Sequence, residues 1–411
     1  MKRAAVADET ELYPPSTAEQ AIRRSRQTMR QSTLREVLAL ASRPGVLSFA
    51  VGLPAAELFP AAGLSAAAGH LLAGDRSSLQ YGIPYQPLKE QVVELMAMRG
   101  VACRTEQVFL TSGAQQGMDL LSHLLVEPGS RVMLEETVYD GLPMAVKKLS
   151  PELLTLPTDL DAGIDVDAVE ALLAGGAAPA FLYLITDGHN PLGVSLSPAK
   201  RQRLADLARH HRMPILEDDA YGFLYYEDSP APPLRALEAE WVYYLGSFSK
   251  ILAPSLRAGW LIVPPELVPI LAALKHGTDI DTPSFSHRVI SAFLASGALP
   301  RHLELLRSEY RTRRDAMLAA LAARMPGEVR WNRPASGMFL WVELPKRVDT
   351  ARLVRTAIEE EQVAFSPGEA FTAGGGHHAR NCMRLAFANC TPEQIEEGVR
   401  RLARVVERAL A

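Results

Sequence analysis

From about residue 105, the chain alternates short apolar runs with longer segments of helical pattern. The helical segments include AQQGMDLLSHLL and SPAKRQRLADLARHH, whose apolar residues recur at the spacing of one helix face. The apolar runs, in chain order, are VFL, RVML, LLTL, FLYLI, MPILE, WVYYLGS and GWLIV. Strands and helices in this rhythm imply right-handed crossovers. We therefore predict an α/β fold with a mainly parallel sheet covered by helices on both faces.

The pattern changes after residue 285. A long charged helix leads to the short strands GMFLWVEL and CMRLAFAN, and a further helix closes the chain. This pattern predicts a smaller α+β domain, completed by a helix near the N-terminus. The predicted parts are an N-terminal arm at 1–15, an N-terminal segment at 16–48 joining the small domain, a large domain at 49–295 and a small domain at 296–411.

Composition excludes several classes of protein. The formal net charge of the 411 residues is -4, without the clustered basic surface typical of nucleic-acid binding. The N-terminal residues lack the apolar core of a signal peptide, and no apolar run is long enough to cross a membrane. Cys103, Cys382 and Cys390 have no disulfide or metal-ligand spacing, and the pair His377 and His378 has no third ligand nearby. We predict a soluble cytoplasmic protein without a bound metal.

Polar clusters follow the apolar runs repeatedly, as TSGAQQG, EETVYDG, TDGHNPLG, EDDAY and SFSK. In parallel sheets, ligands bind beyond the carboxyl ends of the strands, where such clusters meet. Gly113, Ala114 and Gln115 stand between a strand and a helix start, where free N–H groups suit a phosphate. Each cluster by itself also fits an ordinary turn, and EDDAY fits a solvated acidic turn.

The clusters together favour one ligand. A phosphate site, a carboxylate, a lysine and an aromatic residue at successive strand ends are what pyridoxal phosphate requires. Lys250 would form the Schiff base, kept reactive by burial and by the nearby cation Arg257. A carboxylate of EDDAY would keep the ring nitrogen protonated, and Tyr139 would lie flat against the ring.

The ordered set of motifs carries a family resemblance. From about residue 30 to 400 the chain resembles fold-type I pyridoxal-phosphate aminotransferases, in particular the aminoadipate and kynurenine aminotransferases. The matching stretches are STLREVLALASRPGVLSFAVGLPAAELFP, LQYG, TSGAQQ, HNPLGV, EDDAY, GSFSKILAPSLRAGW and MRLAFAN. The resemblance implies a large, mainly parallel sheet of the seven-stranded type with a small α+β domain, and a homodimer with shared active sites.

The resemblance also implies roles for single residues. Lys250 would bind the cofactor and move the proton at the substrate's α-carbon, and Asp218 would pair with the ring nitrogen. Arg384 would bind the α-carboxylate, and Arg35 matches a position that meets an acidic substrate side chain in some relatives. A solvated helix arginine is an equal interpretation of Arg35. The other implied cofactor contacts are Gly113, Ala114, Gln115, Tyr139, Asn190, Tyr221, Ser247, Ser249, Arg257 and, from the other subunit, Tyr81; Asn190 and Gly52 would also border the substrate.

Several residues depart from the family pattern. None of them is Lys250, Asp218, Arg257 or Arg384, so the departures bear on the substrate side-chain pocket and on the reaction type. Val51 stands where glycine is common, Ala114 where serine is usual, and Gly188 where a bulky residue is usual. Glu135 and Asp140 flank Tyr139 and are expected to hold its turn. We predict transfer of the α-amino group of an L-amino acid to a 2-oxo acid. The alternatives are another pyridoxal-phosphate reaction on the same scaffold (elimination, substitution, C–C bond formation, decarboxylation or oxidation) and a regulator that senses the cofactor.

Overall fold

The computed structural model describes residue 18 and residues 43–82, 84–280 and 283–411. The predicted arm at 1–15, most of the segment at 16–48 and the candidate residue Arg35 lie outside these residues. Within the described ranges, no helix is both long and apolar enough to cross a membrane. The predicted domain boundaries remain predictions.

All seven apolar runs become strands of one seven-stranded sheet, in the order β2-β10-β9-β8-β7-β3-β4. The prediction of a mainly parallel α/β fold is confirmed: β10 pairs antiparallel with both of its neighbours, and the other adjacent pairs are parallel. The strands are β2 (Val108–Thr111), β3 (Arg131–Glu135), β4 (Glu152–Leu156), β7 (Phe181–Ile185), β8 (Ile215–Asp218), β9 (Val242–Ser247) and β10 (Gly259–Ile262).

Helices bury both faces of this sheet, which explains why its strands read as continuous apolar runs. Successive side chains of β7 alternate between two cores. Phe181, Tyr183 and Ile185 belong to the core that includes α5 (Ala114–Leu125), whereas Leu182 and Leu184 pack with α7 (Val166–Ala174) and α8 (Pro198–His211). The remaining helices of this part are α3 (Ala61–Gly74), α4 (Gln86–Met98), α6 (Gly141–Val146), α9 (Leu234–Leu237), α10 (Leu267–Asp279) and α11 (Ser284–Ala295).

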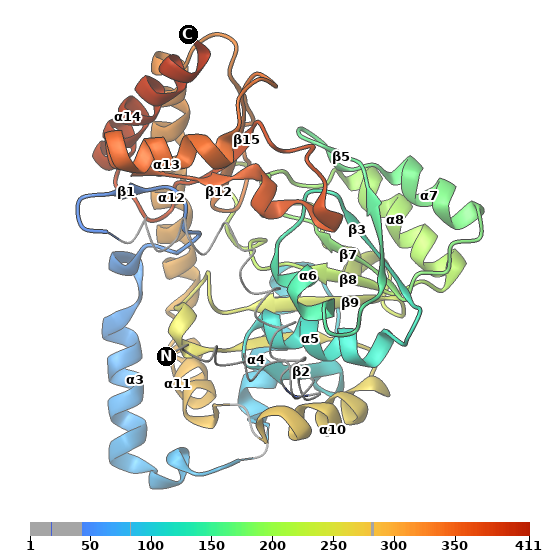
Figure 1. The fold of residues 1–411 in the computed structure, drawn as a ribbon. Coiled ribbons are helices and arrows are strands. Elements are labelled where there is room, and N and C mark those ends of the chain that lie inside the picture. Colours follow the sequence, from blue (N-terminus) through green and yellow to red (C-terminus); the bar gives the residue numbers. More distant parts are fainter. Residues whose placement is uncertain (1–17, 19–42, 83, 281–282) are drawn as a thin grey trace, which may run out of the picture.

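A second, four-stranded sheet lies above the seven-stranded sheet in the view of Figure 1. Its central strands β12 (Phe339–Glu343) and β15 (Cys382–Ala386) are antiparallel and are flanked by β11 (Arg330–Trp331) and β14 (Ser366–Pro367). The long helix α12 (Leu299–Arg324) packs against α14 (Pro392–Leu410), which also contacts α13 (Thr350–Glu361). The short strands β1 (Leu47–Ser48) and β13 (Val363–Ala364) pair in parallel, and β5 (Thr158–Asp159) pairs with β6 (Gly163–Ile164).

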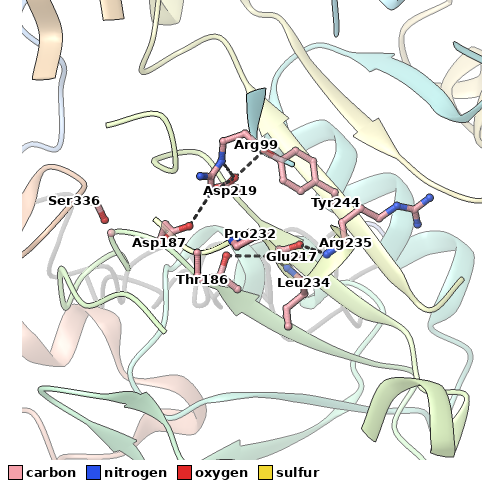
Figure 2. Close-up of polar contacts among 12 residues, drawn as sticks. Arg99, Thr186, Asp187, Glu217, Asp219, Pro232, Leu234, Arg235, Tyr244 and Ser336 are labelled. Carbon is pink, nitrogen blue, oxygen red and sulfur yellow. Dashed lines mark hydrogen bonds and ion pairs between the residues drawn. The ribbon is translucent and has the colours of Figure 1, made fainter. Parts of the chain in front are cut away.

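Three consecutive acids, Glu217, Asp218 and Asp219, are buried where β8 ends. Burying a carboxylate is costly unless it is paired or hydrogen-bonded. Glu217 accepts bonds from the hydroxyl of Thr186 at 3.0 Å and from the backbone N–H groups of Leu234 and Arg235 at 2.7 and 2.9 Å. Figure 2 shows these bonds beside those of Asp219. Glu217 and Asp219 therefore each have hydrogen-bond partners of their own at the end of β8.

The partners of Asp219 belong to a buried network of opposite charges. Arg99, at the end of α4, donates to Asp219 at 3.1 Å and to Asp187 at 2.8 Å. Tyr244 on β9 donates to Asp219 at 2.8 Å, and Arg201 on α8 donates to Asp187 at 2.6 Å. The network thus joins the ends of β7 and β8 to α4 and α8, whose buried residues belong to the cores on opposite faces of the sheet. Figure 2 shows the part of the network around Arg99 and Asp219.

We expect Arg99→Met to lower the free energy of unfolding by about 3 kcal/mol or more, because it leaves Asp219 and Asp187 buried with one cation fewer. Urea unfolding of the purified protein measures this loss. The matched control is Arg104→Met, since the Arg104 side chain is 78% exposed and should change stability little. Equal losses in the two variants would contradict a structural role for the network.

Candidate active site

A cavity of about 330 Å³ lies between the carboxyl ends of the large sheet and the second sheet. Its walls combine strand-end residues of the first sheet with Phe339 and Arg384 of the second. The lining residues are Ala50, Val51, Gly52, Ala114, Gln115, Met118, Tyr139, Asp140, Ile185, Asn190, Asp218, Ala220, Tyr221, Ser247, Ser249, Lys250, Pro254, Arg257, Phe339, Phe371 and Arg384.

Asp218 lines this cavity and has one unsatisfied oxygen. Its Oδ2 accepts a hydrogen bond from Tyr183 at 2.9 Å, while Oδ1 is buried and has no hydrogen-bond partner among the described residues. Burial raises the pKa of Asp218 to about 6; the bond from Tyr183 works against this rise and the charge of Asp219 adds to it. An orphaned carboxylate oxygen in such a place suits a ligand that brings a positive charge or an N–H donor.

Lys250 follows β9 and faces the same cavity. Its Nζ donates to the carbonyl oxygen of Gly52 at 3.1 Å. Burial lowers the pKa of Lys250 to about 8; Arg384 and Arg257 lower it further and Asp218 opposes them. The amine is thus neutral, and nucleophilic, over a pH range in which an ordinary lysine is protonated.

Arg384 extends from β15 into the cavity between two aromatic rings. Its guanidinium carbon lies 4.5 Å from the ring centre of Phe339 and 4.6 Å from that of Phe371. The side chain donates to Asn190 Oδ1 at 2.8 Å and to the carbonyl oxygen of Ala50 at 2.6 Å, while Nε is buried without a partner among the described residues. Burial lowers the pKa of Arg384 to about 10. A guanidinium that is fixed in position and still has a free N–H donor can bind a carboxylate.

An anion site forms where α5 begins. Gly113 has a φ of +92°, which favours glycine, and a Cβ there would lie 2.7 Å from the guanidinium of Arg257. Arg257 is held by the carbonyl oxygen of Ser112 at 2.8 Å, and Ser247 Oγ accepts from the backbone N–H of Ser249 at 3.1 Å. Backbone N–H groups at a helix start, a guanidinium and hydroxyls are all phosphate ligands.

Comparison with known proteins places this geometry in a family. The family model of aminotransferase class I and II matches residues 44–402. A 2-aminoadipate transaminase of Thermus thermophilus is 41% identical, over 92% of this chain and 95% of that protein. An aromatic-amino-acid aminotransferase of Thermococcus litoralis is 36% identical, over 92% of each. The crystal structure of α-aminoadipate aminotransferase from Thermus thermophilus, complexed with N-(5'-phosphopyridoxyl)-L-leucine, has a TM-score of 0.85 at 39% identity and covers 92% of this chain and 95% of that one.

The chain belongs to the class I and II aminotransferases. It is a pyridoxal-phosphate-dependent transferase of fold type I that moves amino groups, and its substrates are small molecules of the amino-acid and oxo-acid classes. The family resemblance seen in the sequence, with its fold and its cofactor, is confirmed.

The aminotransferase cavity collects most of the site residues predicted from the sequence. Lys250, Asp218, Tyr221, Arg384 and Gly52 line it, as do the predicted cofactor contacts Ala114, Gln115, Tyr139, Asn190, Ser247, Ser249 and Arg257. Gly113 adjoins the cavity through Arg257 without lining it. Tyr81 is 78% exposed and lies outside the lining, while Arg35 lies outside the described residues.

Sequence reasoning missed several residues of this site. Phe339 and Phe371 flank Arg384. Phe339 belongs to GMFLWVEL, whose pattern indicates only a strand, and Phe371 lies outside that run. Tyr183 bonds Asp218 from inside an apolar run, where a lone hydroxyl was the available signal. Asp140, expected only to hold a turn, lines the cavity. Glu135 lies 2.9 Å from His189, buried beside the site.

One departure from the family pattern has a packing explanation in this aminotransferase. Gly188 has a φ of +58°, and a Cβ there would lie 2.6 Å from the Cα of Gly337. Gly337 has a φ of +84°, and its own Cβ would lie 2.8 Å from the Cα of Gly188. Gly188 also donates its N–H to Ser195, whose hydroxyl pairs with Ser336 at 2.9 Å. A bulky residue at 188 would separate these backbones.

The pKa of Lys250 predicts how quickly cofactor-free aminotransferase takes up pyridoxal phosphate. Below pH 8 the amine is protonated and unreactive, so we expect the uptake rate to rise with a midpoint at about pH 8. The measurement is the growth of visible absorbance across a pH series, divided by the rate with Nα-acetyl-lysine to correct for titration of the reagent.

Arg384→Gln should move this midpoint upward, because the cation that favours the neutral amine is gone. Arg333→Gln is the control, since Arg333 is an exposed arginine that is absent from the cavity lining. A midpoint above pH 10 in the unaltered protein would show that Lys250 behaves as an ordinary lysine.

Proposed function

We propose that this aminotransferase moves the α-amino group of an L-amino acid to a 2-oxo acid, with Lys250 as the amine that binds the cofactor. The observation that carries the proposal is the pairing, in one cavity, of a lysine of lowered pKa with the orphaned Oδ1 of Asp218. That donor set fits pyridoxal phosphate: an amine for its aldehyde, an anion for its protonated ring nitrogen and an anion site for its phosphate.

Bound pyridoxal phosphate supplies an aldehyde that captures amines and an electron-poor ring that stabilises negative charge at the substrate's α-carbon. Asp218 would hold a proton on the ring nitrogen, where its unpaired oxygen is available and where a cation relieves the cost of its burial. Lys250 Nζ, released when the substrate's amino group takes its place, would carry the proton away from the α-carbon. Arg384 would orient the substrate by its α-carboxylate.

The remaining predicted contacts would position the ring and the phosphate. Tyr139, whose pKa burial raises to about 12, would stay protonated against the ring, near Gln115. Burial also raises the pKa of Tyr221, which keeps its hydroxyl as a donor beside Asn190. Ser247, Ser249, Arg257 and the N–H groups at the start of α5, next to Gly113, would bind the phosphate.

We further propose a homodimer in which Tyr81 reaches the partner's site. The supporting observation is α3, a 14-residue helix without Asp, Glu, Lys or Arg, in which Ala67 is the only buried residue. Leu79 and Tyr81, just after α3, are 65% and 78% exposed. An exposed helix of mostly apolar residues, continuous with two exposed large side chains, is typical of a surface covered by another subunit.

We also propose a cytoplasmic location. The three cysteines form no disulfide, which fits a reducing compartment. Recovery of the protein outside the cytoplasm after cell fractionation would contradict this.

An amino-donor screen with 2-oxoglutarate tests the proposed reaction. We expect stoichiometric 2-oxo acid and glutamate from at least one L-amino acid, without hydrogen peroxide. Lys250→Ala should abolish the reaction, and Asp218→Asn should lower kcat by at least about a hundredfold, because general acid–base and electrostatic contributions reach that size. Peroxide release, or carbon dioxide without glutamate, would favour one of the other pyridoxal-phosphate reactions instead.

Mixed dimers test the role of Tyr81. Tyr81→Ala and Lys250→Ala proteins are each expected to have low activity. In a hybrid dimer, one site would combine an intact Lys250 with the intact Tyr81 of the other subunit. Dissociation, mixing and reassociation should therefore give activity well above both parents. If Tyr81 acted within its own subunit, every hybrid site would remain defective and no activity would return.

A further inference from the structure

Asp140 is a carboxylate of the cavity wall to which the proposed reaction assigns no task. It follows Tyr139 at the start of α6 and shares the cavity with Arg384. The acids among the lining residues are Asp140 and Asp218, and Asp218 is the one that suits the cofactor ring. The cations of the lining are Lys250, Arg257 and Arg384. No ion pair joins Asp140 to any of them or to another described residue.

The electrostatic surroundings of Asp140 depend on Arg384. Burial raises the pKa of Asp140, and the charge of Arg384 opposes this rise, with smaller help from the backbone N–H groups of Asp140 and Gly141. Arg384 is thus the cation that favours the ionised form of Asp140. A substrate α-carboxylate bound to Arg384 neutralises that cation and places a second anion in the same cavity.

The other two cations of the cavity, Arg257 and Lys250, also have roles in the proposed reaction. Arg257 would face the cofactor phosphate, and the lysine amine gives way to the amino group being transferred. With a neutral substrate side chain, Asp140 would therefore stay partly buried beside an added anion and without a counter-charge, which costs free energy. An acidic side chain would worsen this repulsion. A side chain that ends in an ammonium or guanidinium group would relieve it.

We propose that Asp140 is a specificity-determining residue that selects an amino donor with a cationic side chain. This inference rests on the proposed transamination and names its substrate class. It differs from the acidic donor after which the 2-aminoadipate transaminase relative is named. Asp140 binds the far cation of the donor, while Arg384 binds its α-carboxylate.

The test compares three donors of similar length with the holoenzyme: L-lysine, L-norleucine and L-2-aminoadipate, which carry a cationic, a neutral and an anionic side chain. L-ornithine and L-arginine extend the cationic set. We expect kcat/KM to be highest for a cationic donor and lowest for 2-aminoadipate. Asp140→Asn should reduce the preference for that donor over norleucine by about tenfold, the size of a modest partly buried charge pair.

Two variants separate charge from shape. Asp140→Glu retains the carboxylate and should retain a preference for a cationic donor. Asp161→Asn removes an exposed acid that is absent from the cavity lining and should change nothing. Cofactor absorbance and the thermal midpoint establish that each variant is folded and loaded before its kinetics are compared.

Dissociation constants of unreactive substrate analogues test the role of Asp140 without requiring the transamination reaction. The α-methyl forms of lysine and norleucine have no α-hydrogen to lose, and their dissociation constants follow from changes in the cofactor spectrum. Asp140→Asn should weaken binding of α-methyl-lysine by about tenfold and leave α-methyl-norleucine unchanged.

The outcomes are separable. If no donor is transaminated, the proposed reaction fails, yet the two dissociation constants still decide the role of Asp140. If the unaltered enzyme prefers norleucine or 2-aminoadipate, or if Asp140→Asn keeps the donor and binding preferences unchanged, Asp140 only holds its turn and the inference is overturned.

Discussion

The site depends on the burial of three consecutive carboxylates at the end of β8. Glu217 and Asp219 are stabilised below the sheet edge by backbone N–H groups, Arg99 and Tyr244. Asp218, between them, lines the cavity and keeps one oxygen without a partner among the described residues. Burial raises the pKa of Asp218, and a cation bound beside it would stabilise its ionised form. Activity is thus placed at a position that destabilises the cofactor-free protein.

The second sheet completes the cavity because its loops bond directly to the turn that carries Tyr139. Thr372 forms an antiparallel bridge with Thr137, and the carbonyl of Phe371 accepts from the N–H of Val138 at 2.9 Å. Phe371 also flanks Arg384. One short contact therefore ties the proposed carboxylate-binding arginine to the proposed ring-stacking tyrosine. The Gly188–Gly337 contact is a further approach between the cavity loops and the segment that leads into β12.

Much of this site was predictable because a parallel sheet brings polar strand ends to one edge, whatever their separation in sequence. Asp218 ends β8, Lys250 and Tyr139 follow β9 and β3, and all three line the cavity. Residues that act from inside apolar runs, such as Tyr183, carry no such signal. The same holds for Phe339 and Phe371, because an aromatic residue in a strand or loop usually indicates only core packing.

The sequence by itself determined the order of strands and helices and the chemical groups at the strand ends, because apolar period and turn composition are local properties. Only the tertiary structure decided which carboxylates have partners. Asp219 pairs with Arg99, which lies 120 residues away in sequence, and Asp218 accepts a hydrogen bond from Tyr183. Asp140 lines the cavity and forms no ion pair with another described residue. Pairing of buried charges depends on distances between segments that are remote in sequence, and no local pattern encodes those distances.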